Sequence, residues 1–167
     1  RSLQKKYEKL YPDLNPLFSF AVPGYNMRNQ ELNAVLGSSQ LKRLDYNIRR
    51  RIENFELWIN SLDPNKYFVD YEINGNSNFA LPLIVLNKNK IRFKNVCDIL
   101  TTGGVEYRIG TAGGGNQARQ PYLEKYEFKA GLLPNSDYIH HFSLYIGNHP
   151  QVKKEDIIKL CNKLNKQ

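Results

Sequence analysis

Two hydrogen-bonding side chains stand in a short turn just ahead of the strongest helical pattern of this sequence. The stretch VPGYNMRNQEL covers residues 22–32 and places Asn26 and Arg28 after a Pro-Gly pair. A guanidinium offers a planar set of donors that suits phosphate or carboxylate, and the backbone N–H groups at a helix start attract the same anions. The pair therefore indicates either an anion site or an ordinary helix entry with a surface arginine.

A second candidate site combines cations with glycines. Arg108 ends the segment Glu106-Tyr107-Arg108, and a glycine-rich loop follows before Asn116 and Arg119. Glycines let the backbone approach a ligand closely, and flanking arginines favour phosphate. The loop lacks the GxxxxGK[ST] pattern that cradles nucleotide phosphates. It therefore indicates either a different kind of anion site or a mobile loop that only connects two elements.

A third candidate, His149, follows a strand-like segment in LYIGNHP. An imidazole at a strand end can act as a general base or a hydrogen-bond donor, although a plain turn residue is the simpler interpretation. His140 and His141 are adjacent, so in a strand they would point to opposite faces and make a poor metal site. Cys97 and Cys161 have no second cysteine or histidine at metal-ligand spacing. The sequence alone displays no complete set of nucleophile, base and orienting group.

The spacing of apolar residues predicts the elements that carry these candidates. Apolar residues recur mostly every three or four positions from Leu32 to Leu62, which predicts one helix of about 30 residues with Asn29 as its N-cap. Such a helix is about 45 Å long, so we expect it to pack along another domain or subunit. The other expected elements are a strand at 78–86, a helix at 91–102, a strand at 105–109, a strand at 142–147 and a helix at 153–165. This order predicts an α+β fold, an α/β two-layer arrangement in which helices cover a small, mostly antiparallel sheet.

The composition is that of a basic globular domain. The chain has 167 residues and a net charge of +8, from 24 Lys and Arg against 16 Asp and Glu. A basic chain attracts polyanions, so both nucleic acid and an anionic small substrate are considered. No RNP-like, KH-like or C₂H₂ pattern is present, which makes nucleic acid the weaker alternative. No apolar run of about 18 residues predicts a membrane span, and the unpaired cysteines favour a reduced, cytoplasmic setting.

Three segments, in this order, resemble one protein family. GYNMRNQELNAVLGSSQLKRLDYNIRRR, then GVEYR with GGNQARQP, then LYIGNHP are similar to the C-terminal domain of sugar aminotransferases of the DegT/DnrJ/EryC/StrS type. These are pyridoxal-phosphate enzymes of the aspartate aminotransferase fold. Within the family the segments resemble the nucleotide-sugar 3-dehydratases most. The resemblance extends from about Ser19 to the end of the chain.

The resemblance implies a cofactor, a substrate and an assembly. The cofactor is pyridoxal 5′-phosphate or pyridoxamine 5′-phosphate, the substrate is a nucleotide sugar, and the sites lie at the subunit interface of a homodimer. Asn26, with Arg28 beside it, would contact the phosphate of the neighbouring subunit's cofactor. The residues implied to hold substrate are Arg108, Asn116, Arg119 and His149.

The resemblance also implies a large N-terminal domain that holds most of the cofactor pocket, including the Schiff-base lysine or the histidine that replaces it. Residues 1–24 would be a linker from that domain, and residues 25–167 the small C-terminal domain. We therefore expect a portion of an enzyme that removes the C3 hydroxyl of a 4-keto-6-deoxyhexose in deoxysugar and surface-polysaccharide biosynthesis. The portion should be inactive alone, because the catalytic base lies outside it. The alternatives are an aminotransferase of the same family and, in a different class, a basic nucleic-acid-binding or oligomerisation module.

Overall fold

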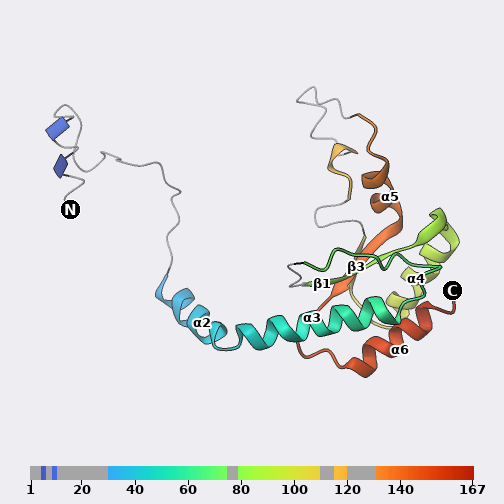
Figure 1. The fold of residues 1–167 in the computed structure, drawn as a ribbon, viewed down its shortest axis with the longest axis horizontal. Helices are drawn as coiled ribbons and strands as arrows, with labels where there is room; N and C mark the ends of the chain where they lie inside the picture. Colours follow the sequence, from blue (N-terminus) through green and yellow to red (C-terminus); the bar gives the residue numbers. More distant parts are fainter. Residues whose placement is uncertain (1–4, 7–8, 11–29, 75–78, 110–114, 120–130) are drawn as a thin grey trace. The chain divides into compact units, whose positions relative to one another are not determined.

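The computed structural model describes residues 5–6, 9–10, 30–74, 79–109, 115–119 and 131–167 (Figure 1). The chain divides into two compact units, Arg1–Leu41 and Lys42–Gln167, and each is described by itself. The predicted anion-binding pair, Asn26 and Arg28, lies outside the described residues, as does the expected N-cap Asn29.

The long helix predicted from the apolar spacing is two helices. Helix α2 spans Glu31–Leu41 and helix α3 spans Leu44–Ser61, with Lys42 and Arg43 in a turn between them. The prediction of one continuous helix is therefore wrong, although both segments are helical as expected.

The apolar face of α2 is irregular ahead of this turn. After Leu36 the next apolar residue with a large side chain is Leu41, five positions on, so the apolar face loses its spacing of three or four. The four residues in this gap, Gly37 to Gln40, are themselves helical, so the two helices do not continue one regular apolar face. In α2 no described residue is buried, and Leu32 is 67% exposed and Leu36 56% exposed.

Helix α3 supplies one wall of the core of the second unit. Asn54, Phe55 and Trp58 recur at the spacing of one helix face and are buried. The Trp58 Nε1 atom donates a hydrogen bond of 2.7 Å to the carbonyl oxygen of Pro82 in the sheet. This bond satisfies the one polar atom of a side chain that is only 1% exposed.

Three short strands form the sheet. They are β1 (Ala80–Ile84), β2 (Tyr107–Ile109) and β3 (Ser143–Gly147). The strand order is β1-β3-β2, and both pairings are antiparallel. The predicted small antiparallel sheet is therefore confirmed, and the last strand in sequence lies at its centre.

One face of the sheet is covered by helices. Leu81 and Leu83 of β1 and Leu144 and Ile146 of β3 are buried on this face. Helices α3, α4 (Lys90–Thr102) and α6 (Lys154–Leu164) pack against it, and Figure 1 shows α3 and α6 running side by side. The core combines residues of all these elements: Phe55, Trp58, Leu62, Tyr67, Leu81, Leu83, Val85, Val96, Leu100, Leu144, Ile146, Ile157, Cys161 and Leu164.

The structure contains one helix that the sequence pattern did not predict. Helix α5 spans Pro134–Phe142, directly before β3, and carries His140 and His141. Its signals are a proline at the first helical position and Asp137 in the first turn, both favoured at helix starts. Two short 3₁₀ segments, η2 (Leu86–Lys88) and η3 (Gln117–Arg119), complete the described elements.

Candidate functional site

Arg108 lies on the face of the sheet that the described helices leave uncovered. In β2 it stands opposite Tyr145 of β3, and Tyr145 stands opposite Pro82 of β1. Residues directly opposite one another in antiparallel strands share a face, and the neighbours of Tyr145, Leu144 and Ile146, point into the core. The row Pro82–Tyr145–Arg108 therefore crosses the open face of the sheet.

A shallow hollow of about 330 Å³ adjoins the Arg108 side chain. The rings of Phe79 and Tyr145 line it and meet edge to face, with centroids 6.2 Å apart. Within the described residues, the guanidinium of Arg108 makes no hydrogen bond and no ion pair. An exposed cation beside aromatic rings suits a ligand that carries an anionic group and a ring.

Asn116 and Arg119, predicted to act together, are brought together by a carboxylate of α5. Asn116 Nδ2 donates to Asp137 Oδ1 at 2.8 Å, and Arg119 Nε donates to the same oxygen at 2.6 Å. Asn116 is 7% exposed, and its Oδ1 also accepts a bond of 3.0 Å from the backbone N–H of Ala118. The Asn116 amide therefore holds the η3 turn and fixes Arg119 next to Asp137.

The backbone before Asn116 requires a glycine. Gly115 has φ +83°, a conformation that side chains rarely adopt, and a Cβ there would lie 2.3 Å from His140 Nδ1. The same His140 Nδ1 accepts a hydrogen bond of 3.2 Å from the backbone N–H of Asn116. Two side chains of α5, Asp137 and His140, thus hold the segment that carries two of the four predicted substrate-binding residues, Asn116 and Arg119.

His149 lies in the turn after β3, and its side chain is exposed. Its Nδ1 accepts a bond of 3.2 Å from the backbone N–H of Gln151, and its carbonyl oxygen accepts one of 3.0 Å from Val152 N–H. The neighbouring Asn148 is 3% exposed and anchors the turn to α3, as Asn54 Nδ2 donates to Asn148 Oδ1 at 3.1 Å. Asn148 is thus a structural residue of this turn.

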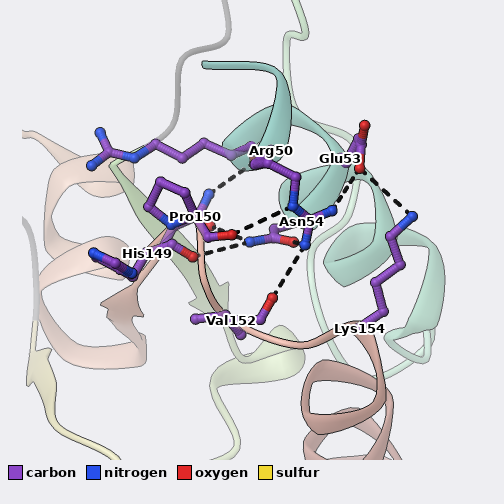
Figure 2. A network of polar contacts seen from close by, with 9 residues as sticks. Arg50, Glu53, Asn54, His149, Pro150, Val152 and Lys154 are labelled. Carbon is purple, nitrogen blue, oxygen red and sulfur yellow. Dashed lines mark hydrogen bonds and ion pairs between the residues drawn. The ribbon is translucent and has the colours of Figure 1, made fainter. Parts of the chain in front are cut away.

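Figure 2 shows how α3 holds the same turn through Arg50. The Nε atom of Arg50 donates to the Pro150 carbonyl oxygen at 3.4 Å, and its Nη2 atom donates to the Val152 carbonyl oxygen at 3.2 Å. Its Nη1 also pairs with Glu53 Oε2 at 2.6 Å, and Lys154 Nζ lies 3.6 Å from that oxygen. The turn that presents His149 is therefore fixed on the surface of α3 by charge-assisted hydrogen bonds.

The pKa values reflect these contacts. The hydrogen bond from Arg119 holds the pKa of Asp137 down, to about 2. The hydrogen bond from Arg50 likewise lowers the pKa of Glu53. Burial raises the pKa of the Cys161 thiol to about 12, which keeps it protonated and unreactive at neutral pH.

Asp137 and His140 of α5 were missed as site residues, because the segment 131–142 was not predicted as a helix. The signal for that helix was present in Pro134 and Asp137. Arg50 and Asn54 were also missed, because nothing in a single sequence shows which polar residue of a helix faces a distant turn.

Among the residues that the structure describes, no group of three or more His, Cys, Asp and Glu side chains could hold a metal ion. Among the described helices, none is both long enough and apolar enough to cross a membrane.

The fold and these motifs define a domain of the aspartate aminotransferase-type enzymes. The model of the DegT/DnrJ/EryC1/StrS aminotransferase family matches residues 3–165. The chain belongs to this family.

Two curated relatives are GDP-4-keto-6-deoxy-D-mannose 3-dehydratases. The protein of Yersinia pseudotuberculosis is 28% identical over 151 residues, which is 89% of this chain and 38% of the relative. The protein of Escherichia coli O55:H7 is 28% identical over 135 residues, which is 79% of this chain and 34% of the relative. The chain therefore spans little more than a third of the length of these relatives.

Solved structures agree with this assignment. A GDP-4-keto-6-deoxymannose-3-dehydratase with a trapped PLP-glutamate geminal diamine has a TM-score of 0.76 and 27% identity, covering 89% of this chain and 39% of that one. The aminotransferase PseC of Helicobacter pylori has a TM-score of 0.69 at 19% identity, covering 87% of this chain and 39% of that one, and so shows the fold alone. The predicted fold class and family are confirmed.

Proposed function

We propose that this chain is the C-terminal portion of a nucleotide-sugar 3-dehydratase that uses pyridoxal or pyridoxamine phosphate. The enzyme would remove the C3 hydroxyl of a 4-keto-6-deoxyhexose, in deoxysugar and surface-polysaccharide biosynthesis. One observation carries the proposal: at equal coverage, identity reaches 26–27% for the dehydratase structures but only 12–19% for the aminotransferases.

The described residues fit the rim of such a site. Arg108 offers a guanidinium without a partner among the described residues, beside the rings of Phe79 and Tyr145. It would hold an anionic group of the nucleotide sugar. Arg119 would contact the substrate from the η3 turn, Asn116 would support this contact by holding that turn, and His149 would contact the substrate from the turn after β3.

The cofactor, when bound, supplies the electron sink that assists loss of the hydroxyl. The proposed contacts of this chain with the cofactor phosphate are Asn26 and Arg28, which precede α2 in the sequence. An amide and a guanidinium suit a phosphate as donors. They would reach the neighbouring subunit of a homodimer.

The proposal includes a second, N-terminal domain that holds the cofactor and the catalytic base. Residues 1–24 would connect that domain to the domain of residues 25–167. With a net charge of +8, the chain suits a diphosphate-bearing substrate, and we place the enzyme in the cytoplasm, where nucleotide sugars are made.

The test uses the whole polypeptide that contains these residues, supplied with pyridoxal phosphate, glutamate and GDP-4-keto-6-deoxymannose. Dehydration removes the C3 oxygen, whereas amino transfer replaces the 4-keto oxygen by an amine. Mass spectrometry of the sugar product distinguishes the two reactions. A 3-deoxy product supports the proposal, an amino sugar supports the aminotransferase alternative instead, and an unchanged sugar contradicts both.

A further inference from the structure

A second hollow lies away from Arg108, between η2, the start of α4 and helix α5. Its volume is about 470 Å³, within the range of small-molecule sites. It shares no lining residue with the hollow beside Arg108. The residues that line it are Lys88, Lys90, Phe93, Lys94, Asp137, Tyr138, His141 and Phe142.

Three lysines give this hollow a positive charge. Lys88, Lys90 and Lys94 are exposed, and none of their ammonium groups forms an ion pair with a described residue. The carboxylate of Asp137 also lines the hollow, but Arg119 already compensates its charge at 2.6 Å. The hollow therefore has an excess of positive charge that no described side chain neutralises.

Aromatic rings form the apolar part of the lining. Tyr138 and Phe142 have ring centroids 5.3 Å apart, and Phe93 and Phe142 have theirs 6.4 Å apart. Phe142 is only 6% exposed and belongs to the interior. Tyr138 also lines the adjoining hollow described below, so its ring can meet the planar ring of an anion whose charged groups lie at the lysines.

Hydrogen bonds of Tyr138 join two walls of the hollow. The Tyr138 hydroxyl donates to the Val85 carbonyl oxygen at 2.8 Å and accepts from the Lys88 backbone N–H at 3.3 Å. Asn87 and Lys88 have φ of 61° and 50°, a conformation uncommon for residues other than glycine. The Tyr138 hydroxyl therefore joins α5 to the η2 turn and fixes the backbone position of Lys88.

An adjoining hollow shares Lys88 and Tyr138 and has a volume of about 830 Å³. Its lining is mostly apolar, from Phe68, Ile84, Leu86 and Ile139, but it includes two side-chain amides. These belong to Asn87 and Asn135 and can each donate and accept hydrogen bonds. A planar base with polar edges matches this combination.

From this arrangement we propose that the two hollows form one site for a nucleoside polyphosphate, with the phosphates at Lys88, Lys90 and Lys94 and the base in the adjoining hollow. Asn87 and Asn135 contact the edge of the base. The site is additional to the substrate site and does not depend on the catalytic activity proposed above.

The experiment measures binding of ATP, GTP, inorganic pyrophosphate and guanosine to the 167-residue chain by isothermal titration calorimetry. The main variant is Lys90→Ala/Lys94→Ala, which removes two cations four positions apart on α4. The matched control is Lys159→Ala/Lys163→Ala, which removes two exposed cations with the same spacing on α6. Fluorescence of Trp58, the one tryptophan of the sequence, checks that each variant is folded.

A nucleoside triphosphate should bind, and the α4 variant should weaken its binding about tenfold or more, since two charge-assisted contacts are lost. The α6 control should bind within about twofold of the parent chain, because neither Lys159 nor Lys163 lines either hollow and exposed charges are screened by salt. Asn87→Gly/Asn135→Ala should weaken binding of the nucleotide but not of pyrophosphate, since glycine keeps the positive φ of the η2 turn.

Three results would overturn the proposal. The first is no binding of either nucleotide at millimolar concentration. The second is an equal loss in the α4 and α6 variants, which would mean attraction to a basic chain as a whole. The third is pyrophosphate binding as tight as that of ATP, which would remove the role of the base. If the α4 variant does not fold, Lys94→Glu alone provides the same comparison.

Discussion

Arg119 and Asp137 form an ion pair that joins two segments of the chain, with Nε 2.6 Å from Oδ1. Within the described residues, the Nη atoms of Arg119 make no further bond. The guanidinium is therefore oriented by Asp137 through one N–H and keeps its remaining donors for a ligand. Asp137 thus acts as a positioning residue for a predicted substrate contact.

The pair predicts a dependence of stability on pH. The pKa of Asp137 is about 2 in the folded chain, mainly because Arg119 donates to it, against about 3.9 for an unperturbed aspartate. Because folding lowers this pKa, the ion pair's contribution to stability is fully present above the pKa of the unfolded chain and is lost as pH falls through about 2. Asp137→Asn should therefore have a lower melting temperature than the parent chain at pH 6, and the difference should shrink between about pH 4 and pH 2.

Melting temperatures measured from pH 2 to pH 7 check this expectation. Glu56→Gln serves as the control, because Glu56 is exposed on α3 and pairs with no described residue. A difference between Asp137→Asn and the parent that stays constant from pH 2 to pH 7 would contradict the role of the ion pair.

The buried amide of Asn54 predicts a loss of stability on substitution. Asn54 is 0% exposed, and its Nδ2 donates to Asn148 Oδ1 and to the His149 carbonyl oxygen. Asn54→Ala removes a donor from buried acceptors, so the free energy of unfolding should fall by about 1–3 kcal/mol. Urea denaturation measures the free energy of unfolding. Asn60→Ala, on the exposed side of the same helix, should change this free energy by less than about 0.5 kcal/mol. Equal losses in both variants would contradict a stabilising role for the hydrogen bonds of Asn54.

Gly115 predicts a local conformational change. In Gly115→Ala the new methyl group would meet His140 Nδ1 at 2.3 Å, at a backbone φ of +83°. The strain should cost about 1–3 kcal/mol of stability, and the His140 imidazole should move. NMR of the His140 ring protons reports that movement. Gly131→Ala, where a Cβ meets nothing within 4 Å, should leave the same resonances in place.

Much of this fold follows from local patterns. Helix α4 was predicted at 91–102 and spans Lys90–Thr102, with Asn89 Oδ1 accepting from the Arg92 backbone N–H at 2.9 Å as an N-cap. The apolar segments at 78–86 and 142–147 likewise predicted β1 and β3. Such patterns can be recognised in a sequence because every second residue of a strand, or one face of a helix, must be buried.

The errors arose where a contact distant in sequence decides the structure. Helix α5 has only nine residues and a weak apolar pattern, and its contact with β3 stabilises it. The pairing of Asn116 with Asp137, 21 positions away, has no local signal at all. Arg108, by contrast, was chosen from the sequence because it stands directly before the glycine-rich loop, where a flanking arginine favours phosphate.

The exposed guanidinium of Arg108 predicts that its removal weakens substrate binding in the enzyme proposed above. Arg108 pairs with no described residue and lines a hollow with Phe79 and Tyr145, so Arg108→Ala should leave the fold intact. If Arg108 holds an anionic group of the nucleotide sugar in both ground and transition states, KM should rise about tenfold or more while kcat changes little. Arg108→Lys should restore part of the loss, because it keeps the charge but not the fork of donors. Steady-state kinetics of the whole polypeptide measure this, with Arg49→Ala on the exposed side of α3 as the charge-matched control. An unchanged KM for Arg108→Ala would remove Arg108 from the substrate site.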